Sequence, residues 1–107
     1  MSLQMSIDSY VEWARSIDPP LPDETAAETQ LASLALGMLA DAGEVADLVK
    51  KRLAGGPLDR DHLAHELGDV LFWWARLCAA TGVPASELLA RNRRHREARI
   101  AKQAAGG

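Results

Sequence analysis

Two acidic pairs set within apolar helical repeats constrain this chain more than any other feature. Asp41 and Glu44 form the first pair, and Glu66 and Asp69 form the second after 21 intervening residues. The i, i+3 spacing of each pair places both side chains on one side of a helix. Carboxylates beside an apolar stripe are costly unless a positive partner or a metal ion meets them. If the two helices pack antiparallel through their stripes, the four carboxylates line one cleft.

The apolar residues around both pairs recur with the period of an α-helix. They are Leu31, Leu34, Met38, Val45 and Val49 around the first pair, and Leu63, Leu67, Val70, Trp74 and Leu77 around the second. Four oxygen donors in a cleft suit a hard divalent cation, Mg²⁺ or Mn²⁺, better than zinc. The alternative is that the acids are simply solvated, as most acidic side chains are.

Chain length and charge narrow the class of protein. At 107 residues we expect one domain over residues 1–107, with a modest core that burial between subunits would supplement. The net charge of −3 gives no reason to expect a nucleic-acid partner. Six of the 12 basic residues fall within residues 91–102, opposed there only by Glu97. That segment could complement the acidic body or a bound phosphate, or it could be a solvated helix end.

Cysteine content and hydropathy predict a cytoplasmic protein with no membrane partner. The single cysteine, Cys78, reads as a small core residue and fits a reducing compartment. No charged-then-apolar leader opens the sequence, and no apolar run approaches the roughly 18 residues of a membrane span.

Turn and capping residues divide the chain into four predicted helical regions. The predicted segments are a helix over 6–17, a proline-rich connector over 18–24, the two acidic helices within 25–80, and a basic helix over 85–102. Ser6 and Asp59 are expected to cap the first and third helices, and Thr25 with Glu28 forms a predicted capping box for the second. No strand alternation is visible, so the chain reads as an all-α bundle of about four helices.

Several side chains near the acidic pairs could meet a ligand. Lys51 and Arg52 fall near the first pair and could hold a phosphate, or could simply favour the helix dipole. Trp73 could wall a ligand cleft, and Trp13 could stack on a base or lie in a subunit contact. Two histidines and two glycines lie close to the acidic pairs in the sequence. His62 shares the helix flank of Glu66, whereas His65 lies towards solvent and has no assigned role. Gly37 is a weak point in the predicted helix, and Gly43 permits close approach of another helix or a ligand.

The runs 36–51 (LGMLADAGEVADLVKK) and 66–73 (ELGDVLFW) resemble the MazG-like nucleotide pyrophosphohydrolases. That family's signature is Glu-x-x-Glu, a gap, and then Glu-x-x-Asp. The resemblance covers residues 28 to about 100 and includes Asn92 and Arg99 in the last helix, with His95 where the family usually has lysine. It implies an all-α bundle, MazG-like and completed by oligomerisation as a homodimer or homotetramer.

The resemblance also implies a reaction and a set of site residues. The reaction is metal-assisted hydrolysis of a nucleoside triphosphate to the monophosphate and pyrophosphate, in nucleotide-pool housecleaning. The metal ligands by similarity are Asp41, Glu44, Glu66 and Asp69, with Mg²⁺, or Mn²⁺ in its place, as cofactor. Beside the resemblance, the position of Glu44 just beyond the apolar stripe predicts that it orients or deprotonates the metal-bound water, and Glu66 is expected to be the second catalytic carboxylate. The resemblance adds Asn92 and Arg99 to the expected substrate contacts. The contacts expected from the residues themselves are Lys51, Arg52, Trp13, Trp73 and Arg96.

Three alternatives stay open at this point. The substrate could be phosphoribosyl-ATP or dUTP, as in related all-α pyrophosphohydrolases. The chain could be a catalytically inactive helical module that dimerises, which is favoured by Asp41 standing where the family usually has glutamate. It could also be a helical bundle whose acids are only surface.

Overall fold

The chain folds into α-helices alone over the residues that the structure describes. The structure is a computed structural model of the 107-residue chain, and it describes residues 4–17, 19, 21 and 23–106. The helices are α1 (Ile7–Ile17), α2 (Glu24–Leu53), α3 (Arg60–Thr81) and α4 (Ala85–Gly106). The predicted all-α bundle of about four helices is therefore confirmed. Residues 18, 20 and 22 of the predicted proline-rich connector lie outside the described residues.

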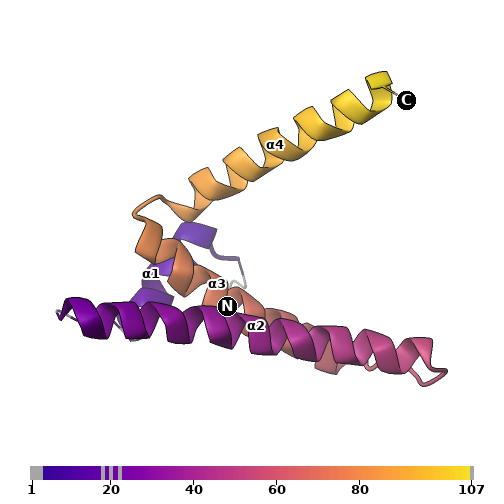
Figure 1. Cartoon of the computed structure of the whole chain (residues 1–107), viewed down its shortest axis with the longest axis horizontal. Helices are drawn as coiled ribbons and strands as arrows, with labels where there is room; N and C mark the ends of the chain where they lie inside the picture. Colours follow the sequence, from indigo (N-terminus) through magenta and orange to yellow (C-terminus); the bar gives the residue numbers. More distant parts are fainter. Residues whose placement is uncertain (1–3, 18, 20, 22, 107) are drawn as a thin grey trace.

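The long helices α2 and α3 form the body of the molecule. They run antiparallel and lie side by side, joined by a short turn (Figure 1). Helix α1 packs on α3 and touches α4, while α4 extends away from the other three helices beyond its first turns (Figure 1). The acidic pairs lie on α2 and α3, so the antiparallel pair is the element that positions the candidate site.

Capping side chains define where the helices begin. The Ser6 hydroxyl accepts a bond from Ser9 N at 3.0 Å, and Asp59 Oδ1 accepts from His62 N at 3.0 Å, which confirms both predicted caps. The capping box predicted at Thr25 is wrong. Asp23 caps α2 instead, with Oδ1 accepting from Ala26 N at 2.9 Å. Thr25 consequently lies inside the first turn of α2.

A side chain from α1 secures the start of α4. Asp8 accepts two hydrogen bonds from Ser86, one from the backbone N–H at 2.9 Å and one from the hydroxyl at 2.6 Å. These bonds hold the pKa of Asp8 below its ordinary value. They satisfy a backbone N–H at the start of α4, which the helix itself cannot do. The first turn of α4 is therefore held against α1 by two residues that are 78 positions apart in the sequence.

The buried core is small and lies where α1, α3 and the start of α4 meet. It consists of Val11, Ala14, Ala75 and Ala85, with Phe72 and Trp74 among the partly buried residues packed against it. Cys78 is also buried, as predicted. The small side chains allow the helices to approach closely, which explains how so few residues form a core.

Much of the apolar stripe of α2 and α3 stays exposed in the single chain. Leu34 and Leu48 are buried, but Leu31, Val49 and Leu67 are each more than 40% exposed. The two helices therefore do not pack through their complete apolar stripes, because a single neighbouring helix covers only part of a stripe. No helix in the described part of the chain is both long and apolar enough to cross a membrane.

Candidate metal centre

Three of the four predicted metal ligands meet between α2 and α3. Asp41 and Glu44 from α2 and Glu66 from α3 each offer a carboxylate oxygen, and these oxygens all lie within 4.8 Å of one another. We call these three residues the acidic cluster. Asp69 is not in this cluster: it groups instead with Glu66 and with His65, a residue to which the sequence assigned no role. Glu66 is common to both groups.

Glu66 is the most deeply placed of these acids. The residue is 5% exposed, and its Oε1 lies 3.3 Å from His62 Nε2, so His62 occupies the flank predicted for it. Glu66 Oε2 is buried and has no hydrogen-bond partner among the described residues. A buried carboxylate oxygen without a partner is costly, and a bound cation removes that cost. This oxygen is the observation that fits the acidic cluster to a divalent ion.

Repulsion between the carboxylates of the acidic cluster also favours a bound cation. The adjacent Glu66 carboxylate raises the pKa of Glu44, with further contributions from desolvation and from Asp41. Two carboxylates at such close range cannot both ionise without a penalty. A hard divalent cation bound by their oxygens would neutralise the repulsion, and Mg²⁺ or Mn²⁺ has the required preference for oxygen ligands.

The indole of Trp73 fixes the position of Asp41. Trp73 Nε1 donates a hydrogen bond to Asp41 Oδ2 at 2.6 Å. The ring lies against Gly37, where an added Cβ would come within 2.8 Å of Trp73 Cε2. The absence of a side chain at Gly37 is therefore what admits the indole, a role that sequence reasoning missed. In contrast, no atom lies within 4 Å of a Cβ added at Gly43, so the close approach predicted there has no counterpart within the described chain.

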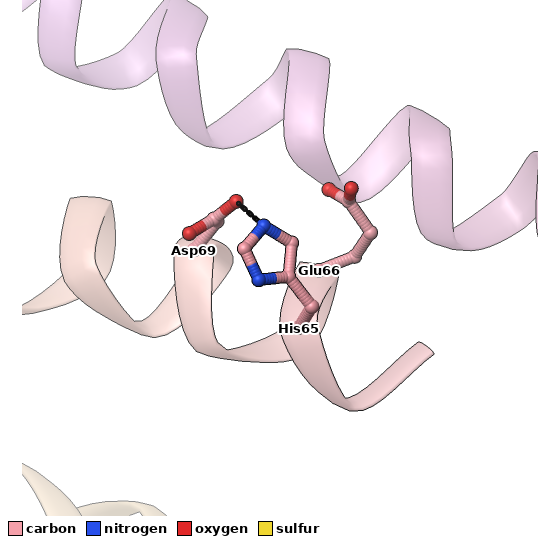
Figure 2. A group of neighbouring side chains, drawn as sticks. All are labelled: His65, Glu66 and Asp69. Atoms are coloured by element: carbon pink, nitrogen blue, oxygen red, sulfur yellow. Dashed lines mark ion pairs between the residues drawn. The ribbon is translucent and has the colours of Figure 1, made fainter. Parts of the chain in front are cut away.

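Asp69 and His65 lie on the solvent side of α3. Figure 2 shows the imidazole of His65 directed at the Asp69 carboxylate, with the Glu66 side chain alongside. His65 Nε2 lies 3.4 Å from Asp69 Oδ2, and the side chains are 70% and 46% exposed, respectively. The fourth predicted ligand is therefore next to the acidic cluster but faces a different set of neighbours.

The predicted phosphate-binding cations on α2 make local contacts. Lys51 Nζ pairs with Asp47 Oδ2 at 3.1 Å, and Arg52 Nη1 donates to the Gly56 carbonyl at 3.3 Å. The structure therefore does not bring them into contact with the acidic cluster in the described chain. Lys51 was expected near Glu44, but the two are seven residues apart, roughly 10 Å along a helix, whereas Asp47 is one turn away.

The remaining predicted substrate contacts are dispersed over α1 and α4. Trp13 is 52% exposed and its ring lies 6.2 Å from that of Phe72. Asn92 lines an apolar cavity of about 500 Å³ between α1, α3 and α4. Arg96 and Arg99 are exposed on the part of α4 that extends from the body (Figure 1). None of the four belongs to the acidic cluster in the described chain.

One buried basic residue went unnoticed in the sequence. Arg76 is 6% exposed and lines a cavity of about 430 Å³ between α1, α2 and α3, together with Arg15 and Glu28. The signal that could have revealed it is local: Arg76 is the one charged residue in the run 70–80. A lone charge in an apolar helical run is expected to be partly buried and to have a specific partner.

Fold and site together define an all-α protein with an acidic metal-type centre on two antiparallel helices. A family model described as the MazG nucleotide pyrophosphohydrolase domain matches residues 29–92. This range contains the acidic cluster, Asp69 and Asn92. The chain belongs to this family. Comparisons with curated proteins and with solved structures returned no match.

Proposed function

We propose that the chain hydrolyses a nucleoside triphosphate between the α- and β-phosphates, releasing the monophosphate and pyrophosphate. Membership of the MazG nucleotide pyrophosphohydrolase family supports a reaction of this class. The observation that carries the proposal is the convergence of Asp41, Glu44 and Glu66, together with the buried oxygen of Glu66 that has no hydrogen-bond partner among the described residues. Nucleotide-pool housecleaning is the role that such a reaction serves.

The site residues divide the work by their exposure. Asp41, Glu44, Glu66 and Asp69 would hold Mg²⁺ or Mn²⁺, an ion that neutralises phosphate charge and makes water more acidic. Glu44 is exposed, so it can orient a water arriving from solvent and accept its proton. Glu66 is buried and serves to hold charge in place rather than to exchange protons with solvent. Trp73 keeps the Asp41 carboxylate aimed at the same point.

Substrate contacts and assembly complete the proposal. Exposed cations, Lys51 and Arg52 on α2 and Arg96 and Arg99 on α4, would meet the triphosphate and the outgoing pyrophosphate. Trp13 and Trp73 would contact the base, and Asn92 the nucleotide. We also propose a cytoplasmic homodimer or homotetramer. The assembly is supported by the exposure of large apolar side chains on α2, such as Leu36 at 65% and Leu39 at 68%.

Pyrophosphate release from a panel of nucleoside triphosphates tests the proposal. The panel includes canonical and modified bases, dUTP and phosphoribosyl-ATP, each assayed with Mg²⁺, Mn²⁺ or EDTA. Wild type should release pyrophosphate with metal only, and Glu66→Gln should lose at least about a hundredfold in rate because a buried ligand is removed. Asp61→Asn is the matched control, since it removes one charge from the exposed first turn of the same helix. Silence of the folded, metal-binding protein across the panel would refute the reaction and favour an inactive module.

A further inference from the structure

The cavity between α1, α2 and α3 is lined by a buried arginine that the proposed chemistry does not use. Arg76 is 6% exposed, and the cavity has a volume of about 430 Å³. Cavities of this size are typical of small-molecule sites in proteins. We propose that this cavity is a base subsite that selects guanine, so that the preferred substrates are guanine nucleotides. The proposal rests on the function proposed above and names the substrate class that the same site would take.

The lining of the cavity combines apolar walls with a few polar groups, as a nucleobase requires. The walls include the side chains of Ala27, Leu31 and Leu34. Flat aromatic ligands bury their faces against apolar side chains and are oriented by a small number of polar groups. Among the polar groups of this lining are the guanidinium of Arg76 and the carboxylate of Glu28. A ligand that satisfies both groups presents hydrogen-bond acceptors and donors on its edge.

Guanine carries this combination of groups. Its O6 and N7 atoms are adjacent acceptors, and the fork of an arginine such as Arg76 donates to both at once. Its N1–H and N2–H₂ groups are donors that a carboxylate such as Glu28 accepts. Adenine has an N6 amino group in place of O6, so it would turn a donor towards the buried guanidinium. Because a buried donor that loses its acceptor is costly, the cavity should discriminate against adenine.

The cavity and the acidic cluster lie along the same pair of helices. Leu34 of the cavity is seven residues before Asp41 on α2, which is roughly 10 Å of helix. Arg76 is ten residues after Glu66 on α3, which is roughly 15 Å. Both offsets point the same way because α2 and α3 are antiparallel (Figure 1), and a long helical side chain such as that of Arg76 leans back towards the N-terminus of its helix. A nucleotide whose α-phosphate lies at the acidic cluster can therefore extend its base into the cavity.

A purely structural role is the competing explanation for the burial of Arg76. This residue makes an interaction within the chain, and a buried arginine can serve simply to hold helices together. A guanidinium has five N–H donors, however, so a contact within the chain and a contact with a base edge are compatible. A structural arginine would influence the affinities for guanine and adenine nucleotides equally, whereas a base contact sets their ratio.

Calorimetric titration of the full chain with GMP and with AMP tests the subsite without reference to turnover. The two ligands share ribose and phosphate, so the ratio of their dissociation constants reports the base alone. We expect wild type to bind GMP about tenfold or more tightly than AMP, and this ratio to fall to within about twofold in Arg76→Gln. Arg76→Lys keeps the positive charge but lacks the planar fork, and it should lose the preference as well. Arg60→Gln, in the exposed first turn of the same helix, is the matched control and should keep the ratio.

Either of two results would overturn the inference: no preference for GMP over AMP in wild type, or a preference that persists in Arg76→Gln or Arg76→Lys with wild-type helix content by circular dichroism. Pyrophosphate release from GTP and from ATP with Mg²⁺ is scored separately. Guanine-selective binding without release from either nucleotide would refute the proposed function alone. Release with equal kcat/KM for GTP and ATP would refute the guanine subsite alone.

Discussion

The contact between Gly37 and Trp73 predicts an unusual response to Gly37→Ala. An added Cβ would lie 2.8 Å from Trp73 Cε2, well inside ordinary carbon–carbon contact. The indole is rigid, and its Nε1 is engaged with Asp41 at 2.6 Å, so the ring cannot move aside without disturbing that bond. We expect overpacking to cost about 1–3 kcal/mol, against a gain of about 1 kcal/mol for replacing glycine in a helix.

Gly43→Ala is the matched control on the same helix. No atom lies within 4 Å of its added Cβ, so the gain of about 1 kcal/mol should appear without a cost. Urea unfolding should therefore separate the two variants by about 1–3 kcal/mol, with Gly37→Ala the less stable. Calorimetry should show Mg²⁺ affinity reduced about tenfold in Gly37→Ala, because Asp41 is no longer oriented. A Gly37→Ala protein that matches Gly43→Ala in stability and wild type in Mg²⁺ affinity would refute this reasoning.

Three further predictions address the acidic cluster and the attachment of α4. Trp73→Phe keeps a ring but removes the donor, so calorimetry should show Mg²⁺ affinity reduced about tenfold, with Trp13→Phe unchanged as control. Hydrogen bonds from Ser86 lower the pKa of Asp8, so they stabilise the fold fully above its ordinary pKa of 3.8, and this stabilisation is lost as pH falls through the lowered value. Asp8→Ala should therefore lower the Tm at pH 7, with a deficit that shrinks as the pH falls below 3.8; a deficit that does not change with pH would contradict this. Glu66→Gln should lower the pKa of Glu44 in metal-free protein, because Glu66 raises it; an unchanged carboxyl titration by NMR would argue against their proximity.

Local sequence patterns predicted what depends on helix periodicity alone. The 3.6-residue repeat identified the helices, and the i, i+3 spacing identified the acids that α2 contributes to the acidic cluster. The same spacing could not show that Asp69 would face away. Positions i and i+3 differ by about 60° around a helix at about 100° per residue. Once Glu66 points inward, Asp69 is therefore turned towards solvent and His65.

Contacts that depend on the register between helices were beyond sequence reasoning. Trp73 and Asp41 are 32 residues apart, and their bond exists because α2 and α3 are aligned at that level. The prediction of the N-cap of α2 was wrong for a different reason. Asp23 and Thr25 can both cap a helix, and their local preferences for the N-cap position are too similar to decide between them. The exposure of Leu31 and Leu67 likewise follows from how few helices are present to cover them.

The anchored position of Asp41 predicts that restoring the family's usual glutamate would weaken the site. Asp41→Glu inserts one C–C bond, about 1.5 Å, between the backbone and a carboxylate that already bonds Trp73 Nε1 at 2.6 Å. The longer side chain cannot both keep that bond and stay in the acidic cluster. We expect Mg²⁺ affinity to fall about tenfold in the wild-type background, but little in Trp73→Phe, where the anchor is already lost. A double-mutant cycle by calorimetry measures this coupling. An equal loss of Mg²⁺ affinity on Asp41→Glu in both backgrounds would show that the hydrogen bond from Trp73 is not what makes aspartate the better ligand at this position.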